Sequence, residues 1–273
     1  MGGLAAFPES RKMKTDAAER GLEGRVALVT GSARRTGSAI ARRLAACGAA
    51  VMITGRTSLD EARAVADDIE RTHGADRAAA MVADITEPEQ ASALVEGTVA
   101  RFGRLDILVN NAAMRGTADV ETLPFAEWRS ILQSILDGAF LCSQAAVPHL
   151  ARSGAGRIVN IGGISAHVSG ARHTAVITAK AGLNGLTKAL AYDLGPKGIT
   201  VNCVAPGTMI SPDDGPERAE RLRGYLQSNP IPLGRAGAPE DVADAVAALC
   251  GPAFRYMTGQ IVHINGGKFL GGS

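Results

Sequence analysis

The feature that most constrains the fold of this chain is the regular alternation of short apolar runs with helical patterns. The apolar runs are rich in β-branched residues and lack polar alternation, which is typical of strands buried on both faces. The predicted strands cover residues 25–30, 50–54, 78–82, 106–110, 157–161, 200–204 and 260–264, and the predicted helices cover 37–47, 59–72, 88–101, 125–149, 171–194 and 239–248. This order predicts a single α/β domain built on a doubly wound, mostly parallel, seven-stranded, Rossmann-like sheet.

Two segments depart from this alternation. Residues 1–22 are charged and lack the apolar region of a signal peptide, so we interpret them as a flexible N-terminal leader ahead of a domain at 23–273. Residues 207–235 contain four prolines and one short helical piece, 217–227. Because this segment follows the sixth strand, near the edge where such sheets bind ligands, we expect it to be a substrate lid rather than a surface excursion.

Composition excludes several classes of partner. The net charge is only +2, which gives no reason to expect nucleic acid or a membrane surface, and there is no run of 18 apolar residues that would predict a membrane span. The four cysteines, Cys47, Cys142, Cys203 and Cys250, have no CxxC spacing. They are expected to be buried thiols in a reducing cytoplasm, with no metal site. The chain is therefore predicted to be a cytoplasmic protein that acts on a small molecule.

The first strand leads into a glycine-containing junction. Residues 26–43 read VALVTGSARRTGSAIARR, with Gly31 directly after the strand and Gly37 where the helical pattern begins. A turn of this kind directs backbone N–H groups and the positive end of a helix dipole at an anion, usually a pyrophosphate. Taken alone, the two glycines are also compatible with a plain tight turn.

The order of motifs from about residue 22 to the C-terminus resembles the short-chain dehydrogenase/reductase family. TGSARRTG at 30–37 resembles the family's TGxxxGxG loop, with Arg35 in place of its middle glycine, and NNAA at 110–113 resembles its NNAG strand end. VNCVAPG at 201–207 is similar to the segment that lies along the nicotinamide, and residues 234–246 and 258–267 resemble the last helix and strand.

The resemblance implies a nicotinamide dinucleotide site and a homo-oligomer, a tetramer or dimer, formed through the helices at 125–149 and 171–194. Asp84 matches the acidic position that holds the adenine in this family. The implied cofactor-binding residues are Gly31, Ser32, Arg34, Arg35, Thr36, Gly37, Arg56, Asp84, Ile85, Asn110, Ala112, Lys180, Pro206, Gly207 and Thr208.

Charge at the end of the second strand indicates which cofactor binds. A site for NAD(H) usually has Asp or Glu there to accept hydrogen bonds from the ribose. Here the strand ends in Gly55 and Arg56, and the next acid is Asp60. Arg56, with Arg34 or Arg35, can offer guanidinium groups to a 2′-phosphate, which favours NADP(H) over NAD(H).

The catalytic positions depart from the family pattern. The family places a Tyr, its proton donor, four residues before the Lys that holds the nicotinamide ribose. Lys180 matches that lysine, but the residue four before it is Val176. The family's Ser falls on Gly163 and its Asn on Ile135, so Lys180 is the catalytic position that is retained.

Three interpretations of this departure stay open. His173 lies seven residues before Lys180, a spacing similar to that of Tyr and Lys in the enoyl-thioester reductases, and about two helical turns would put both on one face. His173 is therefore the candidate proton donor, ahead of the weaker substitutes Ser165, His167, Arg172 and Thr178. Alternatively, a conjugated acceptor takes its proton from water, as the 2,4-dienoyl thioester reductases of this family, which also lack the Tyr, make plausible.

In the third interpretation the protein is a catalytically inactive, NADP(H)-binding family member that serves as a sensor or a partner subunit. The retained Lys180 favours a working site. The prediction is an NADP(H)-dependent oxidoreductase that transfers hydride to or from a small carbonyl or enoyl compound with an atypical proton donor, in which Lys180 and His173 are the catalytic residues.

Overall fold

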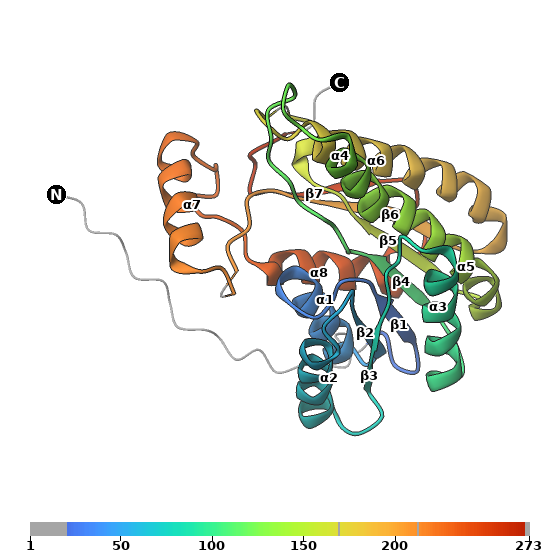
Figure 1. Ribbon diagram of the computed structural model, residues 1–273. Coiled ribbons are helices and arrows are strands. Elements are labelled where there is room, and N and C mark those ends of the chain that lie inside the picture. The colour runs from blue at the N-terminus through green and yellow to red at the C-terminus, as the bar shows by residue number, and fades with distance from the viewer. Residues whose placement is uncertain (1–20, 169, 212, 271–273) are drawn as a thin grey trace.

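The computed structural model describes residues 21–168, 170–211 and 213–270. A seven-stranded sheet, with the strand order β3-β2-β1-β4-β5-β6-β7, crosses the centre of the molecule (Figure 1). All the described strand pairs are parallel. The strands are β1 (Val26–Val29), β2 (Ala50–Gly55), β3 (Ala78–Val82), β4 (Ile107–Asn110), β5 (Arg157–Ile161), β6 (Thr200–Pro206) and β7 (Ile261–Ile264). The predicted doubly wound sheet is confirmed.

Helices cover both faces of this sheet (Figure 1). One face carries α1 (Arg35–Ala46), α2 (Leu59–His73) and α8 (Pro239–Cys250), and the other carries α3 (Pro88–Phe102), α5 (Gly138–Ser153) and α6 (Thr174–Leu194). On β1, Ala27 and Val29 pack under the first set and Leu28 under the second. Both faces of the strands are therefore apolar, which explains why their sequences show no polar alternation. All four cysteines are buried free thiols.

The predicted helix at 125–149 is one helical segment interrupted by a π-helical turn. It consists of α4 (Phe125–Leu132), the turn η2 (Gln133–Asp137) and α5. By length and composition alone, Phe125–Ser153 could cross a membrane, but a core helix passes the same test, and this segment packs on α3 and α6. The hydroxyl of Ser134, inside the π-helical turn, donates to the carbonyl of Ile131 at 3.1 Å and accepts from the N–H of Met114 at 2.9 Å.

Among the predicted boundaries that differ from the structure, two have a clear physical cause. Helix α6 begins at Thr174, three residues later than expected, because Arg172 has a φ of 67°. The carbonyl of Arg172 instead accepts a hydrogen bond from the N–H of Ala118 at 3.0 Å. Leu22 is buried and its N–H donates to the carbonyl of Cys47 at 3.0 Å, so the folded domain includes the last residue of the predicted leader. Residues 1–20 of that leader lie outside the described residues.

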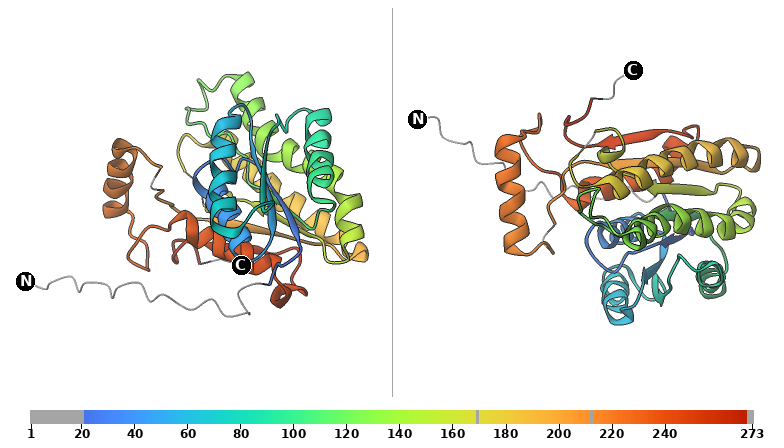
Figure 2. Two further views of the ribbon diagram at one scale, coloured as in Figure 1. Left: turned by 90° about the horizontal axis from the view of Figure 1, so that it is seen from below. Right: turned by 45° about the horizontal axis from the view of Figure 1, so that its top comes forward.

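The predicted lid, residues 207–235, carries α7 (Pro216–Ser228). Its two stems pair with each other: the N–H of Ile210 donates to the carbonyl of Gly237 at 2.9 Å, and the N–H of Gly237 donates to the carbonyl of Thr208 at 3.0 Å. Beyond these stems, α7 stands apart from the sheet and its covering helices in every view (Figures 1 and 2). None of the described side chains of α7 is buried.

Candidate functional site

The glycine loop, residues 30–37, connects β1 to α1 and has no room for side chains at two of its positions. Gly31 has a φ of 62°, and a Cβ there would lie 2.9 Å from the Cα of Ala112. A Cβ on Gly37 would lie 2.3 Å from the carbonyl oxygen of Gly31. The loop therefore folds back tightly against the end of β4, and the first turn of α1, which includes Thr36, follows it directly.

Asn111 fixes this loop against β4. Its side-chain amide donates to the carbonyls of Thr30 and Gly31, both at 2.9 Å, and its backbone N–H donates to the Thr30 hydroxyl at 3.0 Å. The N–H of Ala112 donates to the same hydroxyl at 3.1 Å. Because β1 and β4 flank the point where the strand order reverses, these bonds build the switch-point crevice.

Sequence reasoning missed Asn111 and chose its neighbour Asn110. The Asn110 side chain is buried and donates to Asn160 at 2.8 Å and Ser143 at 3.1 Å, so it joins β4 to β5 and α5 instead of facing the loop. The side chain of Ser32 is also buried: it donates to the carbonyl of Val29 at 2.7 Å and accepts from the N–H of Thr54 at 2.8 Å. The side chains of Asn110 and Ser32 therefore hold the protein together and do not face a ligand.

The three arginines expected near a 2′-phosphate do not lie together. Arg34 is 3.9 Å from Glu61 of α2, and Arg56 is 2.8 Å from Asp84, so both face the ends of β2 and β3. Arg35 turns the other way, and its guanidinium lies 3.4 Å from Asp214 of the lid. The sequence left open whether Arg34 or Arg35 accompanies Arg56, and in the structure Arg35 contacts the lid instead.

Asp84 and Ile85 follow β3. Burial raises the pKa of Asp84, but hydrogen bonds from the hydroxyl and N–H of Thr86 and the charge of Arg56 outweigh it and hold that pKa below its usual value. Ile85 is buried against α5, where a Cβ on Gly138 would lie 2.7 Å from its Cδ1. The close approach of α5 therefore fixes the loop that follows β3.

Lys180 lies at the carboxyl end of β5. Its ammonium donates to the carbonyl of Ile161 at 2.5 Å, and the residue is buried. Burial lowers the pKa of Lys180 to about 8, the thiol of Cys203 opposes this, and the guanidinium of Arg115 adds to it. Arg115, in the loop after β4, is a site residue that sequence reasoning did not single out.

Pro206, Gly207 and Thr208 continue from β6 past the end of β7. The N–H of Gly207 donates to the carbonyl of Ile264 at 2.8 Å, and a Cβ at Gly207 would lie 2.8 Å from the Cα of Asn265. The chain therefore passes close to the end of β7 before it enters the lid.

Lys180 is surrounded by the three positions at which the sequence departs from the family pattern, Ile135, Gly163 and Val176. Ile135 is buried in one apolar cluster with Ala175 and Ala179 of α6, and Val176 packs against the same cluster. A Cβ on Gly163 would lie 3.2 Å from the hydroxyl oxygen of Ser165. The hydroxyl of Ser165 therefore lies where a side chain at residue 163 would extend.

His173 is exposed at the N-terminal end of α6, just before its first residue. Its Nδ1 lies 2.7 Å from the carbonyl oxygen of Ala171. Since a carbonyl only accepts hydrogen bonds, Nδ1 carries the proton in this contact and Nε2 faces away from it. His173 and the buried Lys180 thus sit two turns apart, one at the surface and one in the interior.

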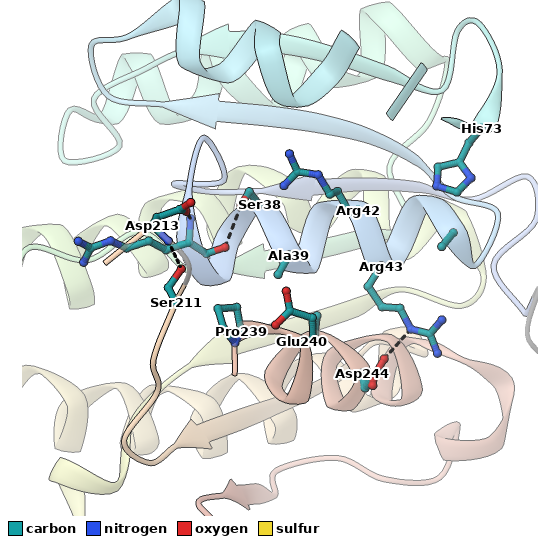
Figure 3. Close-up of a pocket in the computed structure, with 13 residues that line it drawn as sticks. Ser38, Ala39, Arg42, Arg43, His73, Ser211, Asp213, Pro239, Glu240 and Asp244 are labelled. Atoms are coloured by element: carbon teal, nitrogen blue, oxygen red, sulfur yellow. Dashed lines mark hydrogen bonds and ion pairs between the residues drawn. The ribbon is translucent and has the colours of Figure 1, made fainter. Parts of the chain in front are cut away.

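A separate pocket of about 420 Å³ lies between α1 and the start of α8 (Figure 3). Arg42 and Arg43 of α1 line it, and both are paired: Arg42 with Asp68 at 2.8 Å and Arg43 with Asp244 at 2.7 Å. Lys180 and the two loop glycines do not line this pocket. Arg35 and Asp213 do line it, so the pocket adjoins the start of α1.

Comparison with known proteins matches residues 31–268 to the family described as enoyl-(acyl carrier protein) reductase. The chain is 40% identical, over 92% of its length and 98% of the relative's, to a subunit of (2S)-[(R)-hydroxy(phenyl)methyl]succinyl-CoA dehydrogenase from Thauera aromatica. It is 38% identical, over 91% of its length and 98% of the relative's, to 3-oxoacyl-[acyl-carrier-protein] reductase from Aquifex aeolicus.

Solved structures show the same fold. A mutant short-chain dehydrogenase/reductase from Serratia marcescens superposes with a TM-score of 0.83 at 37% identity, covering 91% of this chain and 99% of that one. A putative short-chain alcohol dehydrogenase from Sinorhizobium meliloti superposes with a TM-score of 0.85 at 32% identity, covering 91% and 98%. Together with the glycine loop, the switch-point crevice and the buried Lys180, these matches show that the chain belongs to the short-chain dehydrogenase/reductase family of NAD(P)-dependent oxidoreductases.

Proposed function

We propose that this protein is a cytoplasmic, homo-oligomeric oxidoreductase that uses NADP(H) to transfer hydride to or from a small carbonyl or enoyl compound. The observation that carries this proposal is the buried Lys180 at the carboxyl end of β5. Burying an ammonium is costly, and a lysine whose pKa is depressed in this way is typical of a functional site. An apolar residue would serve a purely structural role better.

The glycine loop fits the diphosphate of a dinucleotide. Its two glycines leave no room for a Cβ, and the first turn of α1 presents backbone N–H groups at that point. Arg34 and Arg56, at the end of β2, support the preference for NADP(H) because guanidinium groups suit a 2′-phosphate. Asp84 accompanies Arg56 there and balances its charge when no phosphate is present.

In this proposal Lys180 holds the ribose next to the nicotinamide and places a positive charge beside the reacting oxygen of the substrate. The nicotinamide supplies the hydride chemistry. Ser165, whose hydroxyl lies near Gly163, donates a hydrogen bond to the substrate oxygen. His173 is the proposed proton donor, with its Nε2 available for a second proton.

The carbonyl or enoyl substrate class is proposed from the relatives. The reductase from Aquifex aeolicus is named for a 3-oxoacyl substrate and the family for an enoyl substrate, both carried on acyl carrier protein. Each chemistry reduces a polarised double bond near a thioester. The apolar cluster around Ile135 and Val176, beside Lys180, suits an acyl chain better than a polar substrate.

The test is a paired fluorescence titration with NADPH and NADH, on the wild-type protein and on Arg56→Ala. We expect wild-type protein to bind NADPH more tightly, and Arg56→Ala to weaken NADPH binding about tenfold or more while it spares NADH, the usual scale for a lost charge-assisted contact. Arg71→Ala is the matched control because Arg71 is an exposed arginine of α2 that pairs with Asp68. Equal losses for both cofactors would show that Arg56 does not read the 2′-phosphate.

A second candidate function is an inactive partner subunit, which the apolar residues at 135 and 176 favour. The Thauera aromatica relative is itself named as a subunit of a dehydrogenase. In this case the wild-type protein turns over no carbonyl or enoyl thioester, whereas Val176→Tyr with Gly163→Ser creates carbonyl reductase activity. The space around Gly163 accepts a Cβ if Ser165 shifts slightly. Appreciable wild-type turnover would exclude this candidate.

A further inference from the structure

Two carboxylates of the lid lie at the N-terminus of α1, beside the glycine loop. The backbone N–H of Arg35, the first residue of α1, donates to the carboxylate of Asp213 at 2.9 Å. The carboxylate of Asp214 lies 3.4 Å from the guanidinium of Arg35 and 2.7 Å from that of Arg218. Figure 3 shows Asp213 and Ser211 next to Ser38, at this end of α1. The lid thus carries negative charge to the helix end that an anion would bind.

A tight turn at the start of the lid holds both acids in place. The N–H of Ser211 donates to the carboxylate of Asp214 at 3.0 Å, and the N–H of Asp213 donates to the Ser211 hydroxyl at 3.2 Å. The N–H of Asp214 closes the turn on the carbonyl of Ser211 at 3.0 Å. Only 2% of the Asp214 side chain is exposed. Asp214 is therefore a packed part of the site rather than a solvated surface charge.

Arginines surround these acids. Burial lowers the pKa of Arg115, the nearby charges of Arg218 and Arg35 lower it further, and Asp214 alone opposes them. The guanidinium groups of Arg35 in α1 and Arg218 in α7 contact Asp214, and that of Arg115, in the loop after β4, interacts with its charge. Such a set of cations suits an anion that carries more than one charge.

We propose that Asp213 and Asp214 are an internal anion that occupies the phosphate end of the dinucleotide site and must leave before the cofactor binds. This inference rests on the proposed function. A diphosphate at the start of α1 would need the same N–H donors and would be repelled by two carboxylates a few ångströms away. The lid acids and the cofactor therefore cannot occupy this place together. When the cofactor binds, Arg35 and Arg218 lose their ion pairs with Asp214 and contact the diphosphate instead.

The remaining contacts of the lid allow this movement. Beyond its paired stems, the lid contacts the body through Lys268, whose ammonium donates to the carbonyl of Asn229 at 3.1 Å and lies 5.7 Å from the ring centre of Tyr225. The N–H of Leu233 also donates to the carbonyl of Gly266 at 3.0 Å. The Arg35 and Arg218 side chains are 41% and 34% exposed, so a dianion in the same place offers both guanidinium groups an alternative partner. The hinge lies in the stems at Met209 and Gly237, which stay paired.

The first test compares the wild-type protein with the double variant Asp213→Asn, Asp214→Asn by NADPH and NADH titration and by stopped-flow binding. Both amides keep their acceptor oxygens, so the turn at Ser211 is preserved. We expect the Kd of NADPH and NADH to fall alike, by about tenfold, if the site is open a tenth of the time in the wild-type protein. The observed association rate should level off with concentration in the wild-type protein and rise linearly in the variant.

Asp244→Asn is the matched control. Asp244 faces α1 from α8 and pairs with Arg43 at 2.7 Å, so its loss changes the charge near α1 without touching the phosphate end. A similar gain in affinity for Asp244→Asn and the double variant would mean that long-range charge, not displacement, is responsible, and would overturn the inference.

Hydrogen exchange gives an independent readout on the full chain. Addition of NADPH to the wild-type protein should speed exchange in peptides from 208–228, because the lid leaves α1, while peptides from 30–37 become protected. Slower exchange in both regions would overturn the inference, since the cofactor would then bind beneath a closed lid. If neither the wild-type protein nor the double variant binds either cofactor, both the proposed function and the inference are wrong. If both proteins bind NADPH with the same Kd, the inference alone is wrong.

Discussion

At the scale of single residues, the site depends on a few side chains whose surroundings differ sharply. Lys180 is buried and held by the carbonyl of Ile161, whereas His173 is exposed two turns earlier on the same helix. Ser165 lies between these extremes in η3 (Ile164–Ala166), close to Gly163. Burial lowers the pKa of Lys180. Whether His173 or Ser165 contacts the substrate depends on where each side chain lies.

The depressed pKa of Lys180 predicts how cofactor binding depends on pH. Below pH 8 the ammonium is charged and attracts the anionic cofactor; above pH 8 the free protein loses this charge, and binding must return a proton. We therefore expect the Kd of NADPH to be flat below about pH 8 and to rise above it, by up to about tenfold per pH unit. Titrations from pH 6 to 10 measure this, and Lys180→Met should remove the break. A break that persists in Lys180→Met would assign it to another group.

The proton-donor proposal predicts different effects for two substitutions. His173→Ala should lower turnover at least about 100-fold, the lower end of general acid–base effects, while NADPH affinity stays nearly unchanged. Ser165→Ala should raise the KM as well, because the hydroxyl contacts the substrate in both ground and transition states. Steady-state kinetics with enoyl and 3-oxoacyl thioesters checks both, and Ser130→Ala, which removes a hydroxyl bonded to the carbonyl of Ala126, is the control. An unchanged rate in His173→Ala would end its role as donor.

At the scale of elements, the π-helical turn joins the long helical segment to the site. It spans Ile135, and α5 begins directly after it at Gly138, which packs against Ile85 in the loop after β3. Ser134 of the turn ties the loop after β4 through the N–H of Met114. One helical segment thus contacts the loops that follow β3 and β4, and both loops carry residues of the proposed cofactor site.

Gly138 and Gly185 provide a matched pair of helix substitutions. A Cβ on Gly138 would meet Ile85 at 2.7 Å, so Gly138→Ala should destabilise the protein by about 1–3 kcal/mol, the usual cost of overpacking. Gly185, in α6, has nothing within 4 Å of its would-be Cβ, so Gly185→Ala should be neutral or stabilise by up to about 1 kcal/mol. Urea unfolding measures both. Equal effects would mean that the contact with Ile85 relaxes freely.

At the scale of the whole molecule, one buried acid fastens the end of the sheet opposite the site. Asp106 accepts hydrogen bonds from the N–H of Val26 at 2.8 Å, from the hydroxyl of Ser153 at 2.5 Å and from Nε and one terminal nitrogen of the Arg104 guanidinium. It therefore joins the starts of β1 and β4 to the end of α5. Although burial raises its pKa, these hydrogen bonds outweigh burial and hold the pKa of Asp106 below its usual value.

Asp106 predicts a loss of stability in acid. Because its folded pKa is depressed, its contribution is complete above the unfolded pKa of about 3.8 and is lost as the pH falls through the folded value. Asp106→Asn should lower the free energy of unfolding at pH 7 by roughly 2 kcal/mol, the cost of leaving buried partners unsatisfied. The free energy of unfolding of this variant should also decrease less steeply as the pH falls. Urea unfolding from pH 3 to 7 checks it. Asp76→Asn, at an exposed pair with Arg101, should change stability by less than about 0.5 kcal/mol.

Much of the fold could be predicted from the sequence because its strands and helices are encoded locally. The seven predicted strands agree with the observed ones to within two residues at each end, since short runs rich in β-branched residues between helical patterns favour buried parallel strands. The glycine loop was predicted because Gly31 and Gly37 stand between the first strand and the first helical pattern, and the structure shows that neither has room for a side chain. These features depend on the types of residue and on the spacing of apolar residues along the chain, both of which can be read from the sequence.

Only the tertiary structure decided which side chains meet. It separated Arg35 from Arg34 and Arg56, turned Asn110 inward and Asn111 toward the loop, and brought Ser165 to Gly163. It also placed Asp213 and Asp214, far along the chain, at the start of α1. The physical reason is that such contacts depend on the path of loops and on the direction of side chains, which hydrophobic period does not encode, whereas burial of apolar strands and helices follows from the order of residues itself.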